Sequence, residues 1–495
     1  MLSRTRFFFT KNSFVLNTLV QTKGCRLSIP TSIHHYHHST IGTTTTKPLF
    51  KLNHFISSIQ SRFYSTIPLQ TSNTTPSSSS SSILTNTEKL KFTNGSNPIS
   101  PKLVGYWLVG TSTLVFGIVV LGGLTRLTES GLSITEWKPV TGALPPLSQE
   151  DWEIEFTKYK DSPEFKQLNS HINLEEFKFI YSMEWGHRLV GRGIGLFFLL
   201  PAIIFWSRGK FSPHITRSVI GLTGLLGLQG FIGWWMVKSG LDQDQLNQRN
   251  SKPTVSQYRL TTHLGAAFLM YLGVLGTAFE ILNENKWAKL SKTAPETVKS
   301  IFIKLQSPSI KKTRLMATGL LCLTFLTAMS GGMVAGLDAG LIYNTFPHMG
   351  DDIIPSYSEL MSPVFARSED KSDLWWRNIL ENPTTVQLVH RIFATTTYFT
   401  ILAAQIYVKK NKVLLPKAAV RSMHGMWAFA NVQVALGIFT LIYLVPIPLG
   451  AAHQAGALAL LTTCLMFAAR LKKPRPEALN YINKLMKDQL LKSRV

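Results

Sequence analysis

Residues 184–192, Glu-Trp-Gly-His-Arg-Leu-Val-Gly-Arg, place a carboxylate, an imidazole and two guanidinium groups at the start of a long apolar run. Ionisable side chains at the mouth of a membrane helix are costly, and they usually indicate a functional site. Glu184 and His187 are three residues apart, and they therefore share one face of a helix. A similar stretch around His390 opens another apolar run about two hundred residues later. The sequence thus predicts two related sites of imidazole chemistry.

Four histidines open the second, fourth, sixth and eighth apolar runs: His187, His263, His390 and His453. These four runs would cross a membrane in the same direction, which puts the imidazoles at about one depth, with one pair in each half of the chain. Imidazole is a common axial ligand of haem iron, and helix bundles build such sites from facing helices. Two pairs therefore suit two haems. A packed or proton-handling histidine is the alternative at each single position, and a copper or zinc site lacks a third ligand or nearby thiolates.

Apolar helices must position these residues. Eight runs are long enough to cross a bilayer, at about 104–126, 186–206, 215–237, 260–282, 314–336, 386–408, 419–443 and 449–470. A lone segment in lipid must satisfy its own backbone, which requires a helix. The net charge of +24 would suggest nucleic acid in a soluble protein. Here the bases lie at the N-terminus and between the runs, so targeting and topology explain them and no nucleic-acid partner is expected. We expect an all-α polytopic membrane protein.

An internal repeat relates the two halves of the chain. The matching pairs are Gly122 and Gly331, Gly123 and Gly332, Glu129 and Asp338, His187 and His390, Gln229 and Gln433, Gly233 and Gly437, and His263 and His453. The offset falls from 209 to 190 along the chain, which indicates that loops differ in length while helices correspond. We therefore expect eight transmembrane helices in two pseudo-symmetric four-helix bundles, residues 103–282 and 313–470, joined by a loop at 283–312.

The two halves differ at one position, where Gln387 stands in place of Glu184. A carboxylate in the first half alone suggests that this half does chemistry while the second carries electrons. The alternative is that Glu184 only bonds to a neighbouring helix. Three arginines near the histidines, Arg188, Arg192 and Arg391, can pair with haem propionates or with lipid phosphates. The third run carries Gly221, Gly224, Gly227, Gly230 and Gly233 at a period of three, which suits either close helix packing or a groove facing the haem.

The ends of the chain predict its destination. No Asp or Glu precedes Glu88, and the first 64 residues combine basic residues with many Ser and Thr, as in a mitochondrial presequence. Residues 65–102 resemble a flexible Ser/Thr-rich linker, and 471–495 form a basic tail. The loops at 127–183 and 337–385 are acidic and alternate with basic ones. The positive-inside rule then places both termini in the matrix and the histidines toward the intermembrane space.

These motifs resemble those of the haem A synthase family of the mitochondrial inner membrane. The resemblance covers roughly residues 100–470 and is carried by 122–133, 184–188, 262–265, 389–391 and 452–454. It implies that the second half holds a haem b cofactor and that the first half binds haem O as the substrate. The residues so implied are His390, His453 and Arg391 for haem b, His187, His263, Arg188 and Arg192 for haem O, and Glu184 as the catalytic residue.

The reaction implied by this resemblance is oxidation of the C8 methyl of haem O to a formyl group, by successive hydroxylations with O2, for cytochrome c oxidase assembly. The implied partners are the farnesyltransferase that makes haem O, a ferredoxin-type electron donor on the matrix side, oxidase assembly factors and the lipid bilayer, with a homo-oligomer as a further expectation. Some bacterial members carry a cysteine pair in the first outer loop, and residues 127–183 contain none. Two other hypotheses stay open: a non-catalytic di-haem electron-transfer or carrier protein, and a transporter whose histidines carry protons.

Overall fold

A computed structural model describes residues 98–139, 141–249 and 252–492, and the predicted presequence and most of the predicted linker lie outside these ranges. The described chain is helical, apart from connecting segments and one isolated bridge between Met349 and Asp352. The long helices are α2 (Lys102–Leu127), α4 (Leu174–Ser207), α5 (Pro213–Leu241), α7 (Gln257–Thr293), α9 (Ser309–Gly336), α12 (Pro383–Lys410), α13 (Lys417–Ile442) and α14 (Ile447–Leu471). The shorter ones are α3 (Gln149–Lys160), α6 (Gln243–Arg249), α8 (Pro295–Gln306), α10 (Tyr357–Leu360), α11 (Leu374–Glu381) and α15 (Pro476–Lys492).

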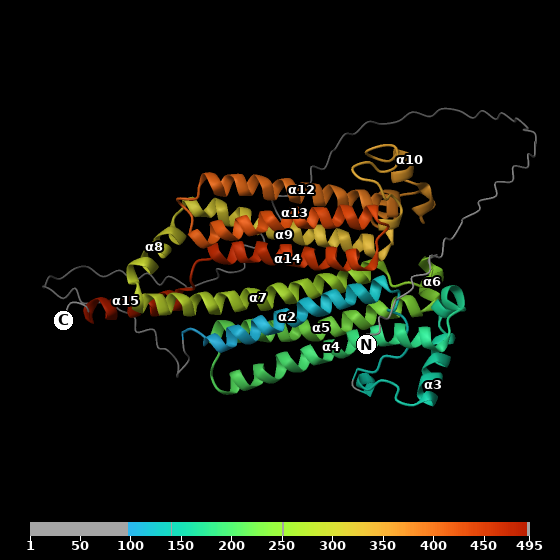
Figure 1. Ribbon diagram of the computed structural model, residues 1–495, viewed down its shortest axis with the longest axis horizontal. Coiled ribbons are helices and arrows are strands. Elements are labelled where there is room, and N and C mark those ends of the chain that lie inside the picture. The colour runs from blue at the N-terminus through green and yellow to red at the C-terminus, as the bar shows by residue number, and fades with distance from the viewer. Residues whose placement is uncertain (1–97, 140, 250–251, 493–495) are drawn as a thin grey trace, which may run out of the picture. The chain divides into compact units, whose positions relative to one another are not determined.

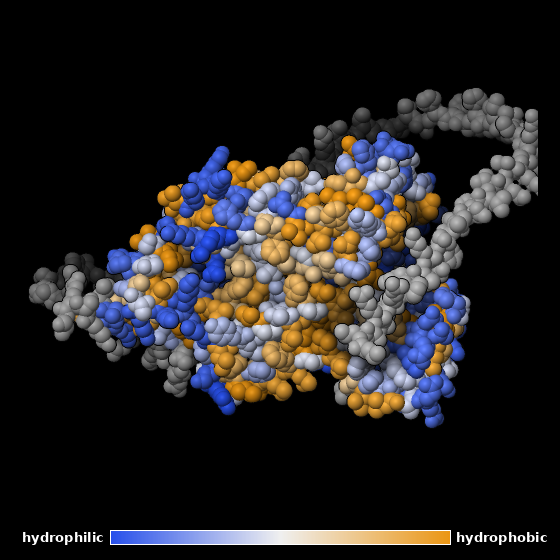
Figure 2. Space-filling model, viewed as in Figure 1, coloured by the Kyte–Doolittle hydropathy of each residue, from blue (hydrophilic) through white to orange (hydrophobic). Residues whose placement is uncertain are grey.

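Each of the eight predicted apolar runs coincides with a long helix, and only the run at 419–443 extends beyond it, by the single residue Tyr443. Seven of these helices, all except α12, are long and apolar enough to cross a membrane by length and composition. The eighth predicted span coincides with α12. This helix is continuous, and many of its side chains are polar, among them several threonines. Figure 2 shows an apolar band across the long helices, with hydrophilic surfaces toward both ends.

The long helices lie side by side in two groups (Figure 1). Each group has its own apolar core. The first core joins α2, α4, α5 and α7 through residues that include Leu108, Phe198, Ile215 and Val274. The second joins α9, α12, α13 and α14 through residues that include Leu320, Ile401, Met423 and Phe467. A third cluster, with Val119, Phe268 and Leu458, lies where α2 and α7 meet α9 and α14. These four helices therefore form the contact between the groups.

The short helices gather at opposite ends of the long ones (Figure 1). We call the end that carries α3, α6 and α10 the loop end, and the end that carries α8 and α15 the basic end. The acidic segments 127–183 and 337–385 belong to the loop end. At the basic end, the segment predicted as a loop at 283–312 is mostly helical, because α7 continues to Thr293 and α8 follows. The predicted basic tail forms α15, which packs against α7 and buries Ala478 and Ile482.

The repeat is visible in the backbone where α2 and α9 end. Glu129 and Asp338, the matching residues after these helices, both adopt left-handed backbone angles, with φ of 53° and 52°. Such a conformation is uncommon for a residue other than glycine. Each turn sends the chain back over the end of its own helix group. Equivalent turns in the two halves therefore begin both acidic segments.

Candidate haem-binding site

The four predicted histidines lie on α4, α7, α12 and α14, near the loop end in each case. His263 and His453 come six residues after the first residue of their helices, and His390 comes seven after. His187 comes thirteen after, because α4 extends beyond the predicted span. Asn173 caps this extension by accepting hydrogen bonds from the backbone N–H groups of the first turn. Each histidine thus lies in the half of its helix that is nearer the loop end.

Each histidine ring packs against a glycine of the preceding long helix. A Cβ atom at the glycine would lie 2.9 Å from Cε1 of His187 for Gly122, 3.0 Å from that of His263 for Gly233, 3.1 Å from that of His390 for Gly331 and 2.9 Å from that of His453 for Gly437. Ordinary contacts of a Cβ atom begin at 3.4 Å. Any larger residue at these four positions would therefore displace the imidazole. The same small-residue cradle occurs at all four histidines.

Four of the five glycines that recur at a period of three on α5 do not support close helix packing. A Cβ at Gly221, Gly224, Gly227 or Gly230 would meet no atom within 4 Å. Of the five glycines at the period of three, only Gly233 makes a close approach, and its neighbour is His263. The explanation by tight packing between helices is therefore wrong for four of the five. The fifth, Gly233, leaves room for the imidazole of His263.

The histidines are paired within each half. His187 interacts electrostatically with His263, and His453 interacts in the same way with His390. All four histidines are half-buried. Among the described residues, no group of three or more His, Cys, Asp or Glu side chains could hold a metal ion. Two imidazoles without further donors suit a haem, whose porphyrin supplies the remaining ligands, better than a bare metal ion.

Hydrogen bonds at Nδ1 determine which nitrogen of each imidazole is free to bind a metal. Ser330 Oγ lies 2.8 Å from Nδ1 of His390 and donates its own proton to the Thr327 carbonyl at 2.7 Å. It can therefore accept the Nδ1 proton, which leaves the Nε2 lone pair of His390 for a metal. Within the part of the chain that the structure describes, no such partner reaches Nδ1 of His187, which is buried without a hydrogen bond.

Two glutamines contact the remaining histidines in matching ways. Gln229 and Gln433 each place Nε2 3.1 Å from Nδ1, the first at His263 and the second at His453. The Oε1 atoms of both glutamines are buried and have no hydrogen-bond partner in the described part of the chain. A half-turn of the amide would let Oε1 accept the Nδ1 proton and free Nε2 of the ring for iron, at the cost of the bonds that the amides now donate to the backbone carbonyls of His263 and His453, at 3.1 and 3.0 Å. The repeat had matched these glutamines, but their contact with the histidines was not predicted.

Glu184 is buried, with 3% of its surface exposed, and all its partners are defined. Oε2 accepts from Ser133 Oγ and from the backbone N–H of Ile134, both at 2.8 Å, and Oε1 accepts from Arg188 Nη2 at 2.7 Å. Ser133 and Ile134 belong to the segment that turns back after Glu129. The carboxylate therefore holds the first acidic segment against α4, three residues before His187.

Gln387 performs the matching task in the second half with the opposite polarity. Its Nε2 donates to the carbonyls of Ala339 and Tyr343, at 2.8 and 3.2 Å, while its Oε1 is buried without a partner. The first half thus holds its segment with a carboxylate that accepts hydrogen bonds, and the second with an amide that donates them. The difference read from the sequence corresponds to a real difference in local electrostatics.

The three arginines are occupied by backbone carbonyls at the loop end. Arg188 donates to the carbonyls of residues 134 and 136, both at 3.2 Å, and Arg192 donates to those of 138 and 139, at 2.8 and 2.9 Å. Arg391 donates to four carbonyls within 343–348, the shortest of these bonds being 2.8 Å. Nη1 of Arg192 and Nε of Arg391 have no hydrogen-bond partner in residues 98–139, 141–249 and 252–492. The pairing of these arginines with propionates or phosphates stays a prediction.

An aromatic cluster covers the Glu184 region from the loop end. Phe156, Tyr159, Phe177 and Tyr181 are buried there with Ile134. Tyr159 donates a hydrogen bond to the carboxylate of Glu164 at 2.9 Å. Burial raises the pKa of Glu164 to about 8, because the charged form loses its hydration. This segment is therefore a small folded unit and not a simple connection.

Comparison with known proteins agrees with this geometry. A family model described as cytochrome oxidase assembly protein matches residues 105–465. The haem A synthase of Saccharomyces cerevisiae is 61% identical over 392 residues, which cover 78% of this chain and 80% of the yeast protein. The human haem A synthase is 42% identical over 372 residues, 75% of this chain and 83% of the human protein.

A third relative is a natural fusion. The haem A synthase-mitochondrial ferredoxin fusion protein of Schizosaccharomyces pombe is 49% identical over 375 residues, which cover 75% of this chain and 60% of the fusion. The match of the family model covers well over half of the chain, and the relatives are similar across most of its described part. The chain therefore belongs to the family of cytochrome oxidase assembly proteins, together with the haem A synthases.

Proposed function

We propose that this protein is the haem A synthase of a mitochondrial inner membrane, an oxidoreductase that converts haem O into haem A for cytochrome c oxidase. The observation that carries the proposal is the fourfold pairing of a histidine with a glycine, two pairs in each half, together with a carboxylate in one half only. Eight membrane-spanning helices, with α12 as the eighth, would form two pseudo-symmetric four-helix bundles. Each bundle would hold one haem between its two histidines.

The second half is the better candidate for a permanent haem b. Both of its histidines have a neighbour at Nδ1, Ser330 for His390 and Gln433 for His453, and such contacts fix the orientation of a ligand. The first half would bind haem O through His187 and His263. Nδ1 of His187 has no partner among the described residues, and a less constrained ligand suits a group that must enter and leave. Haem iron would supply the activation of O2 in this reaction.

Glu184 has a positioning role in this proposal, and its predicted catalytic role remains a hypothesis. Its carboxylate ties Ser133 and Ile134 to α4 and orients Arg188. This arrangement holds the first acidic segment against α4, three residues before His187. A carboxylate so near His187 can also take part in proton transfer once a substrate displaces one of its donors.

The charge distribution supports a matrix location for the basic end. By the positive-inside rule, α8 and α15 would face the matrix and the histidines would lie toward the intermembrane space. The fusion of a relative to mitochondrial ferredoxin supports a ferredoxin as the electron donor. The farnesyltransferase that makes haem O and the oxidase assembly factors remain predicted partners, and a homo-oligomer remains a prediction as well.

Haem analysis of cells that lack the protein tests the proposal. We expect haem O to accumulate and haem A to be absent, with recovery on expression of the wild type. His187→Ala and His390→Ala should fail to restore haem A. Normal haem A in the cells that lack the protein would exclude the synthase and favour a di-haem carrier.

A matched pair of substitutions tests the carboxylate. Glu184→Gln keeps the size of the side chain and removes the charge, and Gln387→Glu makes the reverse change in the other half. We expect haem A to fall strongly in the first variant while haem b stays bound. Unchanged haem A in Glu184→Gln cells would show that the charge is dispensable.

A further inference from the structure

A groove lies between α7 and α14 at the basic end, where the two helix groups meet. It has a volume of about 240 Å³. Phe279, Leu282, Met466 and Ala469 form its apolar part, and Asn283, Lys286 and Arg470 form its polar part. The apolar residues precede the polar ones on α7, so the groove changes from apolar to cationic toward the basic end.

The polar part of this groove lies at the level of the lipid head groups in the membrane. Leu282 packs against Gly105, which is only three residues from the start of α2. Arg470 is the penultimate residue of α14. Two membrane helices, α2 and α14, therefore begin or end near the polar part of the groove, while its apolar part lies at the level of the hydrocarbon. A ligand for this site would have acyl chains and a polar head.

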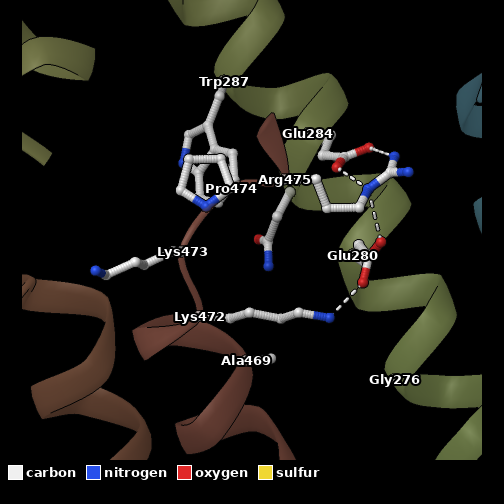
Figure 3. A pocket seen from close by; sticks show the side chains of 10 residues that line it. Gly276, Glu280, Glu284, Trp287, Ala469, Lys472, Lys473, Pro474 and Arg475 are labelled. Carbon is white, nitrogen blue, oxygen red and sulfur yellow. Dashed lines mark hydrogen bonds and ion pairs between the residues drawn. The ribbon is translucent and has the colours of Figure 1, made fainter. Parts of the chain in front are cut away.

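The neighbouring cations show which charges are already neutralised. Figure 3 shows Arg475 between Glu284 and Glu280, at 2.6 and 2.9 Å, with Lys472 also directed at Glu280. These two bases lie in an adjoining hollow that shares Asn283 and Ala469 with the groove. Their charge is balanced by buried carboxylates and is not available to a ligand.

Lys286 and Arg470 have no such balance. Neither forms an ion pair with a carboxylate in the described part of the chain, and the one side-chain bond of Arg470 is to Asn283 Oδ1 at 3.3 Å. Lys286 is exposed. Two uncompensated cations beside an apolar groove are complementary to an anionic group with hydrocarbon chains. Basic pockets between helices on the matrix side of a membrane recognise lipid head groups in this way.

We propose that this groove is a binding site for an anionic phospholipid of the matrix leaflet. Its phosphate would lie between Lys286 and Arg470, and its acyl chains would run along Phe279, Leu282 and Met466. Since α7 and α14 belong to different helix groups, the lipid would join the two halves at the end remote from the histidines. The site is independent of the proposed reaction.

Native mass spectrometry of the purified full chain tests the site. The protein is reconstituted in nanodiscs of phosphatidylcholine with a minor fraction of cardiolipin, released into detergent and examined for retained lipid. We expect the wild type to retain cardiolipin and Lys286→Gln/Arg470→Gln to retain it about 25-fold less, since each basic residue contributes about fivefold, or ~1 kcal/mol. Haem content and monodispersity verify that the variant is folded.

The control removes two charges from the same helix outside the groove. Lys289 and Lys292 are exposed on α7, one and two turns farther from the membrane, and Lys289→Gln/Lys292→Gln should retain cardiolipin like the wild type. Equal retention by both double variants, or equal loss in both, would overturn the proposal. Met466→Trp fills the apolar part without a change of charge and should also release the lipid. Full retention by this variant would exclude the groove as the site of the chains.

Discussion

Substitution of Gly437 by alanine should weaken the binding of the haem that we assign to the second half. The new Cβ atom would lie 2.9 Å from Cε1 of His453, whereas ordinary contacts begin at 3.4 Å. The ring must therefore retreat by about 0.5 Å, which is the tolerance within which a site must hold its ligands. Gly425 of the same helix has no atom within 4 Å of an added Cβ. Gly425→Ala is therefore a matched control.

The magnitude follows from the contact with the imidazole. Overpacking costs about 1–3 kcal/mol, whereas the gain of up to about 1 kcal/mol from alanine in a helix interior acts through the unfolded backbone, and therefore on folding and not on haem affinity. A cost of about 1–3 kcal/mol in the haem-bound state corresponds to roughly five- to 150-fold weaker retention of haem. Gly425→Ala should gain the helix term alone and lose no haem.

Haem per protein in purified variants, and the rate of haem transfer to excess apomyoglobin, measure this effect. We expect Gly437→Ala to be depleted in haem and to transfer the remainder faster than either the wild type or Gly425→Ala. Thermal unfolding of the haem-free proteins serves as a folding control. If Gly437→Ala and Gly425→Ala kept haem equally well, the contact with Cε1 would not determine the position of the ligand.

Two further predictions concern stability. Glu164 has a pKa of about 8 in the folded protein, above its ordinary value of 4.5. Its contribution to the free energy of unfolding is therefore complete below pH 4.5 and is lost as the pH rises to 8. Thermal unfolding should show that this free energy declines by at most roughly 1.4 kcal/mol for each pH unit, and Glu164→Gln should flatten the decline. Gly123→Ala should destabilise the wild type by about 1–3 kcal/mol, because its Cβ would collide with the amide of Gln454. In a Gln454→Ala background the same substitution should cost nothing, and an equal cost in both backgrounds would contradict the contact.

Much of the fold follows from the sequence because hydrocarbon length and composition identify membrane helices. The helices outside the apolar band were not predicted, since their patterns are short and amphipathic. The first twelve residues of α4 are an example, because they are too polar to belong to an apolar run. A capping signal was nevertheless present, with Asn173 followed by Glu176, and the pair Ser148 and Asp151 marks the start of α3 in the same way.

The features of the site likewise include some that could be predicted from the sequence and some that could not. The four histidines and their matching glycines could be found from the repeat, since the offsets tie them together. The partners of Glu184 could not be predicted, because they depend on a left-handed turn at Glu129 that brings Ser133 and Ile134 back to α4. Neither turn residue is a glycine, and the sequence therefore carries no local sign of the conformation.

Adjacent glycines on α2 face different halves of the molecule. Gly122 accommodates His187 of its own half, whereas Gly123 accommodates Gln454 of α14; in the second half, Gly331 faces His390 and Gly332 faces α7. A deletion or insertion of one residue upstream in either helix would rotate these positions by about 100° and disrupt both contacts at once. Length changes in evolution should therefore be confined to the connecting segments, where the offset between the halves does drift, while α2 and α9 keep an unbroken register.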